Sequence, residues 1–249
     1  MDMFEVVAKS GVLKETFKIL GTLLNEVKLV VSPESIKVRA VDPSHVAMVD
    51  LELTKDAFEE YKATDLEIAL DINKLTEFLN IAAHNEKISL TYDEEMNALF
   101  ASIGALKRKL SLLDPTEIKF QKMPQLQLEN FVEVGIKSLK RGIKAAKEVG
   151  TYLTITLNGE GVEFFSKGDI DSVSLKLTKD MCEEIHAVEK AKSVFSLKYF
   201  EKLISSVPDS SETVRIWIGN DIPVKAEFKI AEEKGSVIYL LAPRIMDSD

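Results

Sequence analysis

An internal repeat is the feature that most restricts how this chain can fold. When the sequence of 249 residues is shifted by 126 positions, its hydrophobic positions coincide over a whole half-chain. Leu13 then aligns with Leu139, and Leu90 aligns with Ile216. A shared hydrophobic phase at low sequence identity predicts two halves of similar structure, and the length is sufficient for two ordinary domains.

Each half shows the same order of elements. A short strand is followed by an amphipathic helix, three strands, one further strand, a second helix and three closing strands, with turn sequences such as "SPES" and "NGEG" between strands. The predicted helices span residues 12–24, 72–83, 137–149 and 197–206. Antiparallel hairpins with helices gathered on one side define an α+β architecture.

A stretch without hydrophobic period separates the two halves. It reads "LDPTEIKFQKMPQLQLEN" and contains Pro115 and Pro124, which is typical of an extended connector. The predicted domains are therefore residues 1–114 and 128–249, and residues 115–127 form the connector between them.

The charge balance restricts the possible partners. The chain has 41 Asp and Glu against 32 Lys and Arg, a formal net charge of −9, so on average it repels nucleic acid. If it binds a polyanion, its cations must be segregated on one surface. Cys182 is the only cysteine, which excludes an internal disulfide and fits a reducing compartment. No apolar stretch is long enough for a membrane helix, and the first residues do not resemble a signal peptide.

One predicted helix carries such a segregated surface. At about 100° per residue, its five cations fall within an arc of roughly 120°, opposite an apolar face. The cations are Lys137, Lys140, Arg141, Lys144 and Lys147, and the apolar face is Ile136, Leu139, Ile143 and Ala146. A helix that only faces solvent usually mixes Glu with Lys at i, i+4, and this row contains no acid to relieve the repulsion. We therefore predict a surface that faces a polyanion.

The other predicted helices carry fewer cations, diluted by Glu15, Glu77 and Glu201. Across all four helices, the candidate DNA-contacting residues are Lys14, Lys18, Lys74, Lys137, Lys140, Arg141, Lys144, Lys147, Lys198 and Lys202. Lys and Arg on phosphates give attraction that is independent of base sequence. No aromatic residues lie among the cations of residues 137–147, which argues against a platform for stacking single-stranded bases.

Two segments resemble the proliferating cell nuclear antigen family, the sliding clamps of archaeal and eukaryotic DNA replication. They are "RAVDPSHVAMVDLEL" at residues 39–53 and "LLAPRI" at residues 240–245, and weaker likeness in "LKETFKIL" and "NDIPVKAEFKIA" extends it over essentially the whole chain. The loops of this chain are compact, which makes it more similar to the archaeal than to the eukaryotic members of the family. The resemblance implies a DNA-clamp fold of two like domains in a closed ring of three subunits. Helices would line a central channel around duplex DNA, and antiparallel sheets would lie outside.

The resemblance also implies the partners of the chain. DNA polymerase, a clamp loader, flap endonuclease and DNA ligase would dock a short motif with a Gln and an aromatic pair. By match to the family, the pocket for this motif comprises His45, Val46, Met123, Pro223, Leu241, Ala242, Pro243 and Ile245. The alternative, that Val46, Leu241 and Ala242 are buried strand residues of the core, stays open. The contacts between subunits would involve Lys107, Arg108, Lys109, Ser172, Ser174 and Lys176. The ring is expected to be a homotrimer, although a heterotrimer stays open.

Catalysis has little support in the sequence. There is no Gly-rich phosphate loop, nucleophile elbow or H-E-x-x-H motif, so no enzyme activity, cofactor or metal is expected. Asp42 and His45 fit a turn better than a catalytic pair, and Cys182 with His186 supplies only two metal ligands. Two other interpretations stay open: a monomeric protein that binds DNA through one basic patch, and a scaffold that binds no nucleic acid. The expected location is the cytoplasm at the nucleoid in an archaeon, or the nucleus in a eukaryote, without membrane association.

Overall fold

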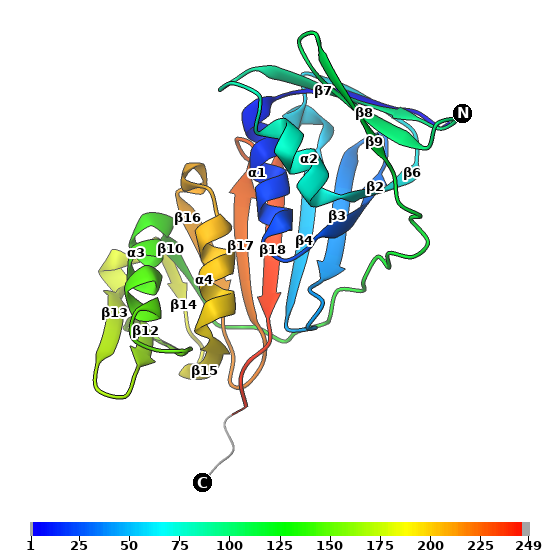
Figure 1. The fold of residues 1–249 in the computed structure, drawn as a ribbon. Coiled ribbons are helices and arrows are strands. Elements are labelled where there is room, and N and C mark those ends of the chain that lie inside the picture. The colour runs from blue at the N-terminus through cyan, green and yellow to red at the C-terminus, as the bar shows by residue number, and fades with distance from the viewer. Residues whose placement is uncertain (1, 246–249) are drawn as a thin grey trace. The chain divides into compact units, whose positions relative to one another are not determined.

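The computed structural model describes residues 2–245, which form helices and mainly antiparallel strands (Figure 1). The described residues divide into two compact units. The first unit comprises residues 2–45, 49–123 and 229–237, and the second comprises residues 46–48, 124–228 and 238–245. No helix in this part of the chain has the length and apolar character required to cross a membrane.

The first unit contains two helices and most of the strands of the N-terminal half. Its elements are β1 (Phe4–Lys9), α1 (Ser10–Gly21), β2 (Glu26–Val31), β3 (Ser35–Val41), β4 (Ala47–Thr54), η1 (Lys55–Ala57), β5 (Glu60–Ala63), β6 (Leu66–Asp71), α2 (Ile72–Leu79), β7 (Lys87–Asp93), β8 (Ala98–Ile103) and β9 (Leu106–Ser111). One set of strands has the order β5-β1-β7-β8-β9, and another has the order β4-β3-β2-β6. Strand β9 therefore lies at the edge of its sheet.

The second unit repeats this plan. Its elements are β10 (Phe131–Gly135), α3 (Ile136–Lys147), β11 (Tyr152–Asn158), β12 (Gly161–Lys167), β13 (Ser172–Thr178), η2 (Lys179–Met181), β14 (Glu184–His186), β15 (Ala191–Ser196), α4 (Leu197–Ser206), η3 (Asp209–Ser211), β16 (Thr213–Trp217), β17 (Val224–Ile230) and part of β18 (Gly235–Leu241). The strands have the orders β13-β12-β11-β15 and β14-β10-β16-β17. Strand β13 is again an edge strand.

The predicted repeat and the α+β class are confirmed, with one error in the element order. Helices α1 and α3 begin and end at positions separated by the 126-residue shift. The sequence analysis missed β5 and β14, each of which follows a 3-10 turn. Both strands are short and expose alternate residues while the others are only half-buried, so neither has the apolar alternation that predicts a strand.

The packing of α3 determines which of its faces meets solvent. Ile136, Leu139, Ile143 and Ala146 are buried, as the periodicity predicts. Gly142 faces β13 so closely that a Cβ there would lie 2.5 Å from Cδ2 of Leu175. Burial of a large aliphatic side chain contributes about 1.5–3 kcal/mol. The apolar face therefore fixes the rotation of the helix, and the cationic face is left exposed.

Candidate nucleic-acid interface and docking residues

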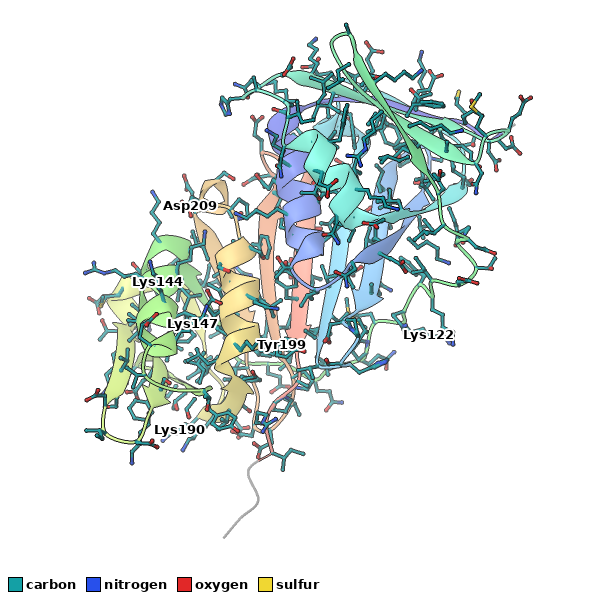
Figure 2. The ribbon with its side chains drawn as sticks, in the orientation of Figure 1. Lys122, Lys144, Lys147, Lys190, Tyr199 and Asp209 are labelled. Atoms are coloured by element: carbon teal, nitrogen blue, oxygen red, sulfur yellow. The ribbon has the colours of Figure 1, made fainter. Side chains whose placement is uncertain are left out.

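In the second unit, α3 and α4 pack side by side (Figure 1). Lys137, Arg141 and Lys144 of α3 are exposed, and no salt bridge of theirs is found within residues 2–245. Figure 2 labels Lys144 and Lys147 on this helix. Lys198 and Lys202 of α4 are also exposed. The unit thus presents several cations that are available for phosphates.

The prediction of a cationic row without acidic relief is wrong for two of the five residues. Lys140 Nζ lies 2.7 Å from Oδ1 of Asp209 in η3, and Lys147 Nζ lies 3.0 Å from Oε2 of Glu201 in α4. Both acids come from outside α3, so the charge pattern of that helix could not reveal them. Exposed ion pairs contribute only about 0–1 kcal/mol, and a phosphate can therefore compete with them.

The first unit is less cationic along α1 and α2. Lys14 Nζ donates to the carbonyl of Ala82 at 2.6 Å, which ties α1 to the segment after α2. Lys74 Nζ lies 3.8 Å from the carboxylate of Asp71, and Lys18 is exposed. Glu15 is half-buried, and burial raises the pKa of its carboxyl, although the Ala231 N–H and the charge of Lys18 oppose the rise.

The residues of the predicted docking pocket differ in exposure. His45 is exposed with a left-handed φ of 55°, and Leu241 is only 1% exposed whereas Ile245 is 80% exposed. Val46, Met123, Pro223, Ala242 and Pro243 are half-buried. The structure brings two of these residues together, because the Ala242 N–H donates to the carbonyl of Val46 at 2.9 Å. Leu241 therefore belongs to the core, and Ile245 is accessible to a partner.

A contact that the sequence analysis missed anchors the connector to β3. The guanidinium of Arg39 lies 5.2 Å from the centroid of the Phe120 ring and forms two hydrogen bonds of 3.0 Å to the carboxylate of Asp50. The Gln121 N–H donates to the Arg39 carbonyl at 3.3 Å. An aromatic residue within an aperiodic stretch was the only available signal. These contacts hold the connector close to the sheet just before Met123.

The predicted subunit-contact residues lie on the edge strands β9 and β13. Lys107, Lys109, Ser172, Ser174 and Lys176 are exposed, and Arg108 is half-buried. Arg108 Nη2 lies 3.5 Å from Glu77, and Lys176 Nζ lies 3.5 Å from Glu163. Since both strands end their sheets, each has backbone groups free to pair with a strand of another chain.

The residues considered for catalysis or metal binding have structural roles. The Ser44 N–H donates to the Asp42 carboxylate at 3.0 Å, and the His45 N–H donates to the Asp42 carbonyl at 2.9 Å, as expected for a turn. The Cys182 thiol donates to the Thr178 carbonyl at 3.3 Å, and His186 stacks on a neighbouring ring. Within residues 2–245, no three His, Cys, Asp or Glu side chains cluster as metal ligands would.

Two family models decide what kind of protein this is. The model of the proliferating cell nuclear antigen N-terminal domain matches residues 3–119, and that of the C-terminal domain matches residues 122–244. The chain belongs to the proliferating cell nuclear antigen family. Members of this family are processivity factors without catalytic activity, so the prediction that the chain is not an enzyme is confirmed. The predicted clamp fold is also confirmed.

Similar proteins support this membership. The DNA polymerase sliding clamp of Methanococcoides burtonii is 36% identical over 244 residues, which cover 98% of this chain and 99% of the relative. The A. fulgidus proliferating cell nuclear antigen, solved with the C-terminal region of FEN-1 bound, matches at a TM-score of 0.93 and 26% identity, over 99% of this chain and 100% of that one. The corresponding protein of Thermococcus kodakaraensis matches at a TM-score of 0.89 and 28% identity, covering 97% and 100%.

Proposed function

We propose that this protein is a DNA polymerase sliding clamp, in which three copies form a ring around duplex DNA and tether the polymerase and other replication and repair proteins. The observation that carries this proposal is the cationic face of α3 in a chain whose net charge is −9. Cations that contact phosphates give a weak attraction that does not depend on base sequence, because no helix or strand enters a groove to contact the bases. A ring that must slide needs this kind of contact, because linkage around the DNA keeps it in place.

The ten cations of the four helices are proposed to contact DNA, with Lys14 contributing least because it is tied to Ala82. Edge strands β9 and β13 of neighbouring subunits are proposed to pair head to tail. We also retain residues 1–114, 115–127 and 128–249 as the two domains and their connector. The proposed partners are polymerase, clamp loader, flap endonuclease and DNA ligase, and the proposed location is with the chromosome.

Retention on closed DNA tests the ring directly. The trimer is loaded by its clamp loader onto nicked circular DNA, and the bound fraction is measured by gel filtration before and after the circle is cut once. We expect retention on the circle and loss after cutting. A monomer that binds through a flat patch would be retained equally on both forms, and a scaffold that binds no nucleic acid would be retained on neither.

Docking of partners is tested at the exposed end of the predicted pocket. Replacing Ile245 with Ser should weaken binding of a peptide with a Gln and an aromatic pair about tenfold, because burial of an Ile side chain contributes about 1.5–3 kcal/mol. Fluorescence anisotropy of a labelled peptide measures the change. Val188→Ser is the matched control, since Val188 is 63% exposed and lies outside the pocket. Equal affinity of the Ile245→Ser variant and the unmodified protein would contradict the assignment.

A further inference from the structure

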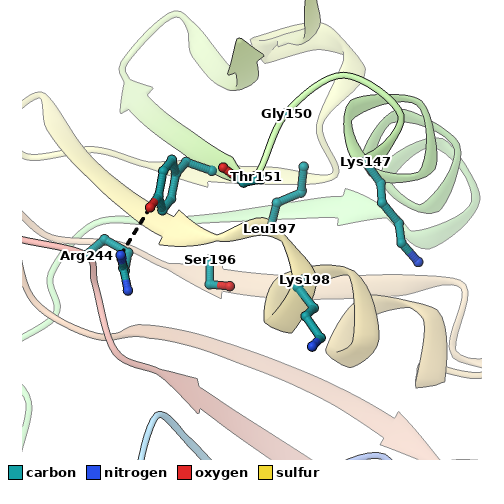
Figure 3. Close-up of a pocket in the computed structure, with 8 residues that line it drawn as sticks. Lys147, Gly150, Thr151, Ser196, Leu197, Lys198 and Arg244 are labelled. Carbon is teal, nitrogen blue, oxygen red and sulfur yellow. Dashed lines mark hydrogen bonds between the residues drawn. The ribbon is translucent and has the colours of Figure 1, made fainter. Parts of the chain in front are cut away.

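A second group of cations lies where the C-terminal end of α3 meets the N-terminal end of α4. Here a pocket of about 320 Å³ opens in the second unit (Figure 3). It is lined by Lys147, Gly150, Thr151, Tyr152, Ser196, Leu197, Lys198 and Arg244. Three of these eight residues are cations, and none carries a carboxylate. Such a lining favours an anion.

Contacts with two residues hold Arg244 in place. The backbone N–H of Arg244 donates to the backbone carbonyl of Val194 at 2.7 Å, which fixes this part of the chain to β15. Its Nη2 donates to the Tyr152 hydroxyl at 3.1 Å, and the guanidinium lies 5.2 Å from the Tyr152 ring centroid (Figure 3). An arginine positioned before its ligand arrives loses less side-chain entropy on binding.

The neutral groups of the pocket can donate to the same ligand. Because the Tyr152 oxygen accepts from Arg244, its own hydrogen is available to an anion. The Ser196 side chain forms no capping hydrogen bond to α4, so capping does not occupy its hydroxyl, which can donate to an anion in the pocket. Lys198 is exposed in the first turn of α4. The ammonium group of Lys147 forms an ion pair with Glu201, a residue outside the pocket lining. Lys147 therefore adds only part of its charge to the pocket.

We propose that this pocket is a phosphate-binding site, with Arg244, Tyr152 and Lys198 as its principal ligands. A guanidinium binds phosphate through a planar fork in a defined direction, whereas exposed lysines exchange readily between phosphates. The site would therefore hold one phosphate in a fixed place, in contrast to the exposed row on α3. The phosphate belongs to a DNA backbone or to a free anion. The first source rests on the proposed function, and the second does not.

Two probes separate these sources. Binding of a labelled 30-base-pair duplex is followed by anisotropy at several salt concentrations, and binding of radiolabelled inorganic phosphate is followed by equilibrium dialysis. The variants are R244Q and Y152F. K137Q is the reference for a DNA contact outside the pocket, because Lys137 is an exposed cation of α3; it should change the slope for DNA and leave binding of inorganic phosphate unchanged. With duplex DNA as the source, R244Q makes the negative slope of log K against log salt shallower by about 0.9, the value expected for one phosphate contact. Y152F then weakens binding a few-fold and leaves the slope unchanged.

The outcomes distinguish this proposal from the proposed function. If R244Q and Y152F bind both probes like the unmodified protein, the phosphate site is refuted, while a reduced slope for K137Q still supports the clamp. If only inorganic phosphate binding is lost in R244Q, the site is supported with a free anion as its ligand. If no variant changes DNA binding, K137Q included, the proposed contact of the clamp with DNA is refuted. Whether the pocket binds phosphate is then decided by the dialysis with inorganic phosphate alone.

Discussion

Reversing the charges of Lys137, Arg141 and Lys144 to Glu lowers the affinity of the trimer for duplex DNA on the order of a hundredfold at moderate salt. These three residues are exposed and form no salt bridge within residues 2–245, so each has its full charge available for a phosphate. Loss of three phosphate contacts makes the negative slope of log K against log salt shallower by about 2.7. Clamp-dependent DNA synthesis falls with it, and both quantities are measured on protein shown to be trimeric by light scattering.

The control for this variant matches its change in net charge. Lys62, Lys190 and Lys192 are exposed and lie outside the four helices, and reversing them to Glu should leave the salt slope nearly unchanged. If both triple variants lose affinity equally, the effect comes from overall charge, and the specific role of the α3 face is refuted.

A variant with the opposite sign sharpens the same test. Asp209→Asn removes the carboxylate that lies 2.7 Å from Lys140 Nζ, and so frees that cation. The affinity for duplex DNA should then rise a few-fold, with a slope steeper by about 0.9. A rise in affinity cannot come from damage to the fold, which makes this result hard to explain without a phosphate at Lys140.

The sequence predicted the features that depend on local periodicity. Every buried position of α3 follows from the 3.6-residue period, because an isolated helix already decides which side chains share a face. The repeat likewise predicted two units with a similar order of helices and strands. Both predictions needed no knowledge of how distant segments pack.

What the sequence could not predict depends on contacts between distant segments. Asp209, which pairs with Lys140, is 69 positions from it in the sequence. The contact between the Arg39 guanidinium and the Phe120 ring likewise joins β3 to the distant connector. Side chains that meet through tertiary packing leave no periodic signal in either segment. The sequence also left open whether Leu241 belongs to the core or to the pocket, because a strand residue in a family motif can serve either; its burial favours the core.

A proline in β13 should separate assembly of the ring from folding of the subunit. Successive N–H groups of a strand point to opposite sides, so one of Val173 and Ser174 donates toward β12 and the other points away from it. Proline removes that donor. One of the variants V173P and S174P should therefore lose about 1–3 kcal/mol of unfolding free energy, because a β12 acceptor is left without its hydrogen bond.

The other proline variant should keep the stability of the unmodified protein and yet run as a monomer in native mass spectrometry, with retention on circular DNA lost. Ser174→Ala and Val173→Ala control for the loss of each side chain and should remain trimeric. Since β13 ends its sheet, no strand of the second unit accepts from the outward-facing donor, which is therefore available to a strand of a neighbouring subunit. Trimers of unchanged stability from both proline variants would show that β13 does not form the subunit contact.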